Sequence, residues 1–144
     1  MEYGVCTLSI VPVRKSTSDT AEIVTQLLFG ERAKVLEKKD NWLYISCEWD
    51  HYEGWIDFKQ LWILDEKVYQ NLKQKGIANQ FIQEISVDYE HVLIPMGASL
   101  SSYKNGTFDY FGMELPVSAS DCDTIPTPNR IIEVAKRYID APYL

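Results

Sequence analysis

The stretch "VPVRKSTSDTAEIVTQLLFGERAKVLEKKDNWLYI" (residues 11–45), followed by "YEGWIDFKQL" (residues 52–61), decides the fold. Short runs of apolar and β-branched residues alternate here with polar turns such as "KSTSDTAE" (15–22) and "KDN" (39–41). Several short strands at this spacing predict a small barrel or sandwich rather than helices. We place this first β unit at residues 1–64.

The pattern changes at Asp65. The run "DEKVYQNLKQKGIANQFIQEI" is rich in helix formers, so it predicts a helical connector over 65–84 with Gly76 as a C-cap or break. A second, shorter β unit is predicted over 85–120. Its strongest local feature is Asn105-Gly106 in "YKNGTFDY", a dipeptide typical of a hairpin turn. The predicted fold class is therefore mainly β.

The segment 121–144 reads as a linker and a final helix, "IIEVAKRYIDAPYL". We expect Asn129 to cap this helix and Pro142 to stop it. Its apolar residues recur at helical spacing and form one stripe: Ile131, Val134, Ala135 and Tyr138. A stripe left uncovered predicts a frayed tail or self-association of the chain through this helix.

Composition excludes several classes of function. The net charge of −7 argues against nucleic acid as a partner, because nucleic-acid binders carry basic patches. No apolar run approaches the roughly 20 residues that span a bilayer, so no membrane contact is expected. The first residues lack the pattern of a secretory signal, which predicts a cytoplasmic protein, or a periplasmic one if a signal peptide has been removed.

Catalytic and metal-binding residues are not predicted in this chain. The three cysteines have wide spacing, and Cys6 and Cys47 lie in strand-like runs as structural thiols. Cys122 lies between two aspartates, which would oppose the thiolate that a nucleophile needs. The histidines His51 and His91 form no triad or zinc spacing with them, and no cofactor motif is present.

The residues 11–61 resemble a bacterial SH3-type domain. The similarity rests on Val13-Arg14 before a polar loop, Phe29-Gly30-Glu31, Trp42 after a turn, and Gly54-Trp55. In such a domain Gly30 is expected to form the tight turn between paired strands, and Trp42 is expected to fill the small core. The second β unit is expected to be a shorter SH3-like copy.

The last fourteen residues, "IIEVAKRYIDAPYL", are similar to the opening helix of the NlpC-type cell-wall cysteine peptidases. In that family a Trp-Gly-Gly turn and an Asp-Cys-Ser-Gly motif with the nucleophile come next, which would place them beyond Leu144. The resemblance implies a truncated γ-D-glutamyl–L-diamino acid endopeptidase acting on murein peptides, with its own peptidase domain as the partner of this chain. The present chain would then be non-catalytic.

The segment "CEWDHYEGW" (47–55) is the candidate binding site. It gathers the carboxylates and rings of Glu48, Trp49, Asp50, Tyr52 and Glu53. Acidic groups beside aromatic faces suit an ammonium group. In the resembled peptidases, SH3-type domains wall off one end of the substrate groove, and some members select peptides with a free N-terminal L-Ala. We hypothesise that this loop receives that amine; the alternative is a solvated acidic rim with Trp55 in the core.

Two further functions remain open at this point. One is a stand-alone SH3-like adaptor that binds Pro-rich peptides over Tyr44, Trp49 and Tyr52. The other is a wall-anchoring module for polymeric peptidoglycan, which would require export. A cytoplasmic protein fits the recycling of small wall peptides better than wall anchoring.

Overall fold

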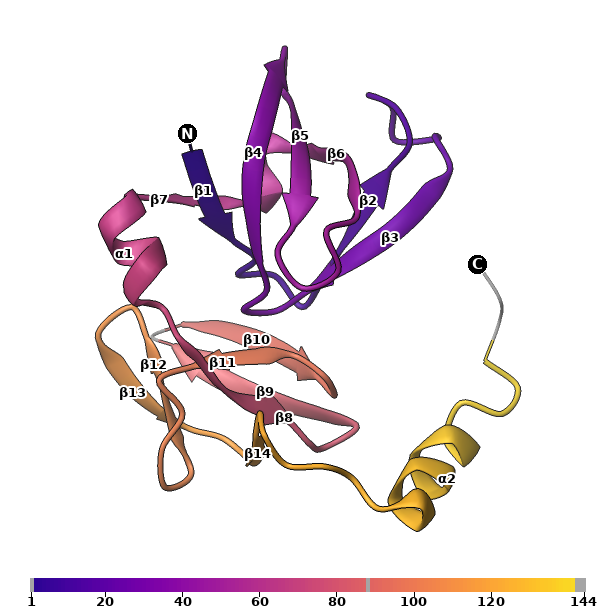
Figure 1. The fold of residues 1–144 in the computed structure, drawn as a ribbon, viewed down its shortest axis with the longest axis vertical. Coiled ribbons are helices and arrows are strands. Elements are labelled where there is room, and N and C mark those ends of the chain that lie inside the picture. The colour runs from indigo at the N-terminus through magenta and orange to yellow at the C-terminus, as the bar shows by residue number, and fades with distance from the viewer. Residues whose placement is uncertain (1, 88, 142–144) are drawn as a thin grey trace.

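The computed structural model describes residues 2–87 and 89–141, and the chain is mainly β, as predicted (Figure 1). The strands up to Leu64 form the first unit: β1 (Glu2–Val5), β2 (Ile10–Arg14), β3 (Ile23–Leu28), β4 (Arg32–Lys39), β5 (Trp42–Cys47), β6 (Glu53–Asp57) and β7 (Trp62–Leu64). The later strands form the second unit: β8 (Gln74–Ala78), β9 (Ile82–Val87), β10 (Glu90–Pro95), β11 (Ser99–Ser101), β12 (Thr107–Tyr110), β13 (Met113–Pro116) and β14 (Ala119–Asp121). The helical elements are η1 (Phe58–Gln60), α1 (Glu66–Asn71) and α2 (Pro128–Lys136).

The first unit is one antiparallel sheet of seven strands in the order β3-β2-β6-β5-β4-β1-β7. Alternation along the strands decides which side chains face its core. In β5, for example, Leu43, Ile45 and Cys47 are buried while the residues between them are half-buried. The inward side chains pack into one core, formed by Cys6, Val11, Val13, Leu27, Ala33, Val35, Leu43, Ile45, Cys47, Ile56 and Leu61.

Two expectations for this unit are wrong. Gly30 does not join paired strands, because β3 pairs with β2 whereas β4 pairs with β1 and β5. Gly30 has a φ of +75°, and a Cβ there would lie 1.8 Å from the carbonyl oxygen of Ser99 in the second unit. Trp42 does not fill the core either, because the aliphatic face of β5 turns inward and leaves Trp42 half-buried.

The second unit is built from a three-stranded sheet, β11-β8-β14, and the two strand pairs β9–β10 and β12–β13. Its core comprises Phe29, Ala78, Ile85, Ile94, Ala98, Leu100, Phe108 and Val117. Phe29 belongs to the first unit in sequence, yet it is 2% exposed and its ring centroid lies 6.1 Å from that of Phe108. The amide of Ser99 donates to the carbonyl of Phe29 at 2.9 Å. The two units therefore share a core residue.

The helical connector expected over 65–84 is wrong beyond α1, which ends at Asn71. The remainder forms β8 and β9, and Gly76 is a buried residue within β8 rather than a helix cap. The physical reason is tertiary: β8 is the central strand of its sheet and pairs with both β11 and β14. Pairing on both edges overrides the helix propensity of its Gln and Lys residues. These strands belong with the unit expected at 85–120.

The turn predicted at Asn105-Gly106 is confirmed. Both residues have positive φ, +53° and +86°, and Lys104 pairs with Thr107 across them. A second turn of this kind joins β12 to β13 at Phe111-Gly112, with φ of +50° and +89°. Sequence did not indicate it, because phenylalanine is unusual in the left-handed region that such turns require.

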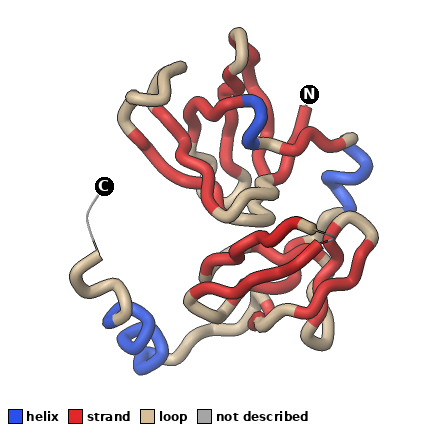
Figure 2. The backbone as a smooth tube through the Cα atoms, turned by 180° about the vertical axis from the view of Figure 1, so that it is seen from behind, coloured by secondary structure: helices blue, strands red, loops and turns tan. Residues whose placement is uncertain are grey.

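The final helix, α2, forms as predicted but starts differently. Its N-cap is Thr127, whose hydroxyl accepts from the amide of Arg130, and not Asn129; Pro128 takes the first turn, where it fits best. The predicted stop at Pro142 lies outside the described residues. Both views place α1 beside the junction of the two units and α2 on the opposite side of the second unit (Figures 1 and 2).

The apolar stripe of α2 is largely uncovered, with Ile131 and Tyr138 at least half exposed. The helix segment touches the second unit through the rings of Tyr138 and Phe81, 5.3 Å apart, and a bond from Arg130 to the Asn79 carbonyl. Within residues 2–87 and 89–141, no helix has the length and apolar character needed to cross a bilayer.

Candidate functional site

The acidic–aromatic loop lies between β5 and β6 and is held closed by its own backbone. The amide of Cys47 donates to the carbonyl of Tyr52 at 2.8 Å, and the amide of His51 donates to the carbonyl of Cys47 at 2.9 Å. The carboxylate of Asp50 accepts from the amide of Tyr52 at 3.0 Å. His51 takes a φ of +58° at the bend. Short-range bonds of this kind fix the loop without help from the core.

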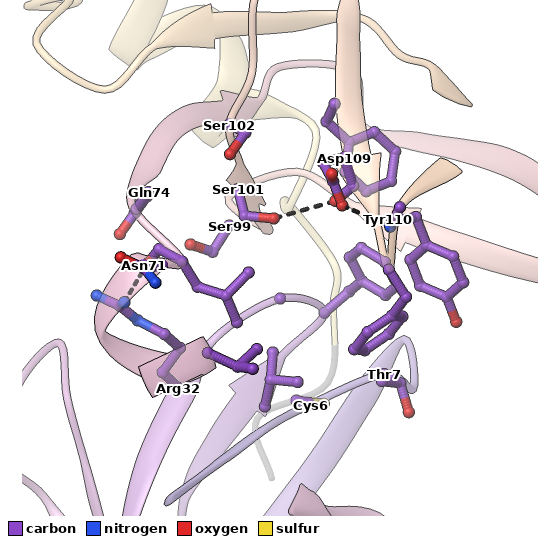
Figure 3. A pocket seen from close by; sticks show the side chains of 18 residues that line it. Cys6, Thr7, Arg32, Asn71, Gln74, Ser99, Ser101, Ser102, Asp109 and Tyr110 are labelled. Carbon is purple, nitrogen blue, oxygen red and sulfur yellow. Dashed lines mark hydrogen bonds between the residues drawn. The ribbon is translucent and has the colours of Figure 1, made fainter. Parts of the chain in front are cut away.

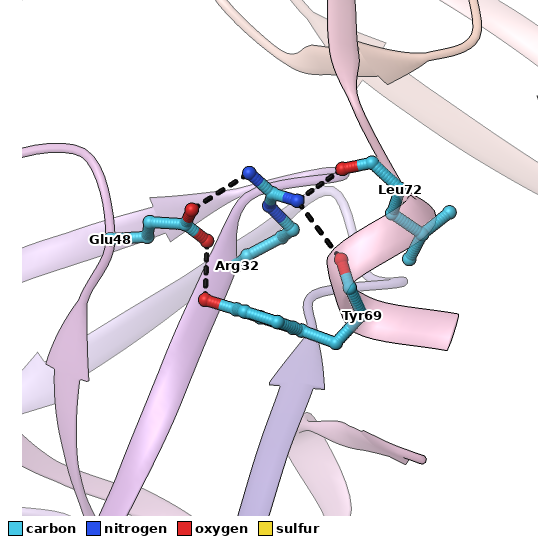
Figure 4. Close-up of polar contacts among 4 residues, drawn as sticks. All are labelled: Arg32, Glu48, Tyr69 and Leu72. Carbon is cyan, nitrogen blue, oxygen red and sulfur yellow. Dashed lines mark hydrogen bonds and ion pairs between the residues drawn. The ribbon is translucent and has the colours of Figure 1, made fainter. Parts of the chain in front are cut away.

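Glu48 is already engaged within the molecule (Figure 4). Its carboxylate accepts from the guanidinium of Arg32 at 2.8 Å and from the hydroxyl of Tyr69. Arg32 also donates to the carbonyls of Tyr69 and Leu72 and lies over the Tyr69 ring, 5.0 Å from its centroid. Burial and the bond to Glu48 raise the pKa of Tyr69, which keeps its hydroxyl a donor. Glu48 thus fastens α1 to the first unit.

Trp49 borders a cleft of about 490 Å³ between the two units. The indole is 73% exposed, and Glu31, Glu48 and Ser99 line the same cleft. Burial raises the pKa of the Glu31 carboxyl, and the nearby charge of Asp50 adds to the shift, while a bond from the Leu28 amide opposes it. Arg32 lines the same cleft and pairs with Glu48, so Glu31 is the carboxyl there without a cation partner among residues 2–87 and 89–141.

Glu53 lies on the outer face of the sheet. Its carboxylate accepts from the hydroxyl of Tyr44 at 3.2 Å, and the Tyr44 ring packs on Trp55 with centroids 5.1 Å apart. Trp55 is half-buried and lies outside the core of the first unit. Tyr52, 49% exposed, follows Asp50 at the tip of the loop. Asp50 and Glu53 form no ion pair within the described part of the chain.

The structure places the five predicted binding-site residues in three different settings. Asp50, Tyr52 and Glu53 present carboxylates and a ring to solvent, Trp49 borders the cleft, and Glu48 is occupied by Arg32.

Sequence reasoning missed Glu31, which joins this acidic cluster. The hairpin of β4 and β5 places Ala33 opposite Cys47. Glu31 lies two residues before Ala33 and Trp49 lies two residues after Cys47, so the two flank the same end of the hairpin. A bulge near Leu36 sets this register, and no residue pattern predicts the bulge.

The remaining chemical groups behave as structural or exposed residues. Cys6 and Cys47 are buried in the first core, and burial raises the pKa of each thiol to about 12. Cys122 is exposed. His91 lies in β10, exposed, with Nδ1 2.6 Å from the carboxylate of Glu84. Among the described residues, no group of His, Cys, Asp and Glu is arranged to hold a metal ion.

Comparisons with known proteins agree with the fold. Residues 13–61 match the family model described as a bacterial dipeptidyl-peptidase SH3 domain. A crystal structure of an NlpC/P60 family protein from Bacillus cereus superposes with a TM-score of 0.73 at 14% sequence identity. The match covers 99% of this chain and 65% of that protein, so the chain spans about two thirds of its length. A search of curated protein sequences finds no significant match. Residues 13–61 of this chain are thus similar to a bacterial SH3 domain. Nearly the whole of this chain shares its fold with part of an NlpC/P60 family protein.

Proposed function

We propose that this chain is the non-catalytic SH3-type region of a murein-peptide cysteine endopeptidase. It packs on the catalytic domain and shapes recognition of the free N-terminal L-Ala end of the substrate. The similarity to a dipeptidyl-peptidase SH3 domain and the fold shared with an NlpC/P60 protein support this setting. A cytoplasmic protein that recycles small wall peptides fits the same proposal.

The observation that carries the proposal is the chemistry of the loop tip. Asp50 and Glu53 hold carboxylates that no cation of the described chain neutralises, and Tyr52 and Trp49 expose their rings beside them. An ammonium group gains charge-assisted hydrogen bonds from the carboxylates and cation–π attraction from the rings. Glu31 adds negative charge nearby, because its carboxyl interacts electrostatically with Asp50.

The test uses the complete enzyme with Asp50→Asn and Glu53→Gln combined. Both amides keep the acceptor oxygens that hold the loop, so the fold is retained while the charge is lost. We expect kcat/KM to fall about tenfold or more for peptides with a free amine, a loss of about 1.4 kcal/mol, and to change little for N-acetylated peptides.

The matched control carries the same change in charge elsewhere, at Glu114→Gln and Asp123→Asn, two exposed residues of the second unit and the linker. It should leave the ratio of the two substrates unchanged. An equal loss on free and N-acetylated peptides in the loop variant would refute the role of the loop in amine recognition.

A further inference from the structure

A second cleft, of about 400 Å³, lies between the two units beside α1 (Figure 3). Its walls come from three parts of the chain: the first unit contributes Phe29 and Arg32, α1 contributes Val68 and Asn71, and the hairpin β12–β13 contributes Tyr110 and Phe111. The volume lies within the range of small-ligand sites. No residue of the loop 49–53 lines it, although it shares Arg32, Gln74 and Ser99 with the cleft beside Trp49.

The cleft offers little net charge to a ligand. Its charged lining side chains are Arg32 and Asp109. The guanidinium of Arg32 is neutralised by Glu48 and spends its other donors on the carbonyls of Tyr69 and Leu72. The carboxylate of Asp109 accepts from the Gly112 amide at 2.9 Å, within its own hairpin. A bound anion would find no free cation and would be repelled by the carboxylate of Asp109, so the cleft disfavours an anionic ligand.

The polar groups on one side of the cleft are uncharged. Asn71, Gln74 and Ser102 lie together there in Figure 3. Their side chains form no hydrogen bond with another described residue, whereas the Ser101 hydroxyl donates to the Asp109 carbonyl. Side-chain amides offer donors and acceptors at once. The backbone of a peptide presents N–H donors and C=O acceptors in alternation. These groups can therefore form hydrogen bonds with the side chains of Asn71, Gln74 and Ser102.

The opposite side is aromatic. Phe29 and Phe108 are buried, Tyr110 is half-buried, and all three line the cleft together with Phe111. Phe111 is 48% exposed and has a φ of +50°. A bulky residue in that conformation costs on the order of 1 kcal/mol, and such strain is concentrated at functional sites. The Phe111 ring packs on those of Trp62 and Tyr110, with centroids 5.7 and 4.9 Å away, and it also lines the cleft.

We propose that this cleft binds a short, uncharged peptide segment that carries an aromatic or large aliphatic side chain. The side chain lies against Tyr110 and Phe111, and the peptide amides bond to Asn71, Gln74 and Ser102. This inference goes beyond the proposed function, since it needs neither a free amine nor the catalytic domain.

The test is a titration of the 144-residue chain, followed by the backbone amide resonances, with N-acetyl-L-phenylalaninamide as the probe. We expect shifts to gather at residues 108–112 and at Asn71. N-acetyl-L-phenylalanine carries the same ring with a negative charge that Asp109 would repel, and it should bind at least about tenfold more weakly. Equal binding of the two probes, or none of the neutral one, overturns the proposal. Binding of N-acetylglucosamine in place of the peptide probe also overturns it.

Two variants locate the site. Val68→Trp fills the cleft from α1 and should abolish the shifts, whereas Lys67→Trp, on the neighbouring exposed position of the same helix, should leave them intact. Phe111→Asn removes the ring and relieves the strain, so it should weaken binding without lowering the melting temperature. A lower melting temperature with unchanged binding would instead make Phe111 a clamp on Trp62, whose ring lies 5.7 Å away, and would contradict the proposal.

Discussion

The side chains of Cys6 and Cys47 illustrate how burial sets chemistry at the residue scale. Both thiols lie in the core of the first unit with pKa values raised to about 12, chiefly by burial. Because the thiolate is the reactive form, neither should react at pH 8 in the folded chain. Cys122 is exposed and should react.

We therefore expect a thiol reagent such as Ellman's reagent to modify one of the three cysteines in the native chain and all of them in denaturant. Cys122→Ser should remove the native reaction altogether. Rapid modification of a second cysteine in that variant would contradict the buried positions of Cys6 and Cys47.

Glu31 gives a prediction about pH. Burial raises its pKa above the ordinary value of 4.5, so the folded chain binds this proton more tightly than the unfolded chain does. The resulting stabilisation is complete below the unfolded pKa and is lost as the pH rises through the folded pKa. Glu31→Gln should therefore raise the melting temperature at pH 7. The gain should vanish in acid, at pH values below the pKa of Glu31 in the unfolded chain.

The control is Glu114→Gln, at an exposed position of β13, which should change the melting temperature little at either pH. A gain for Glu31→Gln that is equally large in acid would contradict this explanation, because it would not depend on the charge.

Residue patterns in the sequence identified the buried thiols but not the partners of Glu48. Cys47 follows from the alternation in β5, which is a local property. The ion pair of Glu48 with Arg32 and the contact with Tyr69 join residues far apart in the chain. Such contacts depend on register and on the docking of α1, and neither is encoded by spacing alone.

At the scale of the element, α1 is held to the first unit by the cluster in Figure 4. Arg32→Ala removes a partly buried ion pair and leaves the carboxylate of Glu48 with one fewer donor. We expect the free energy of unfolding to fall by about 2 kcal/mol, as urea denaturation would measure.

Lys15→Ala provides the comparison, since its ion pair with Glu22 is exposed. Exposed pairs contribute about 0–1 kcal/mol, so this variant should be close to the parent chain. Equal losses in the two variants would mean that the Arg32 cluster does not fasten α1.

The strands of the first unit could be predicted from their alternation and turns, and β8 could not. Helix-forming residues surround Gly76, and only the pairing of β8 with β11 and β14 makes this segment a strand. The turn at Asn105-Gly106 was predicted because its residues prefer positive φ, whereas the turn at Phe111-Gly112 places a disfavoured residue there. Local rules fail where tertiary pairing or strain decides the structure.

At the scale of the whole molecule, Phe29 joins the two units by filling the core of the second from a loop of the first. Its backbone carbonyl also accepts from the amide of Ser99, and Gly30 allows the close approach. We therefore expect the chain to unfold in one cooperative transition by calorimetry. Phe29→Ala should cost about 3–5 kcal/mol and separate the transition into two. Two transitions in the parent chain would contradict the shared core.

We propose that this chain serves a cysteine endopeptidase as its non-catalytic SH3-type region. The most direct measurement is to determine the coding sequence that follows Leu144 in the source gene. We expect a Trp-Gly-Gly turn and then an Asp-Cys-Ser-Gly motif that carries the nucleophile. A stop codon directly after Leu144 would contradict it and would favour a stand-alone adaptor.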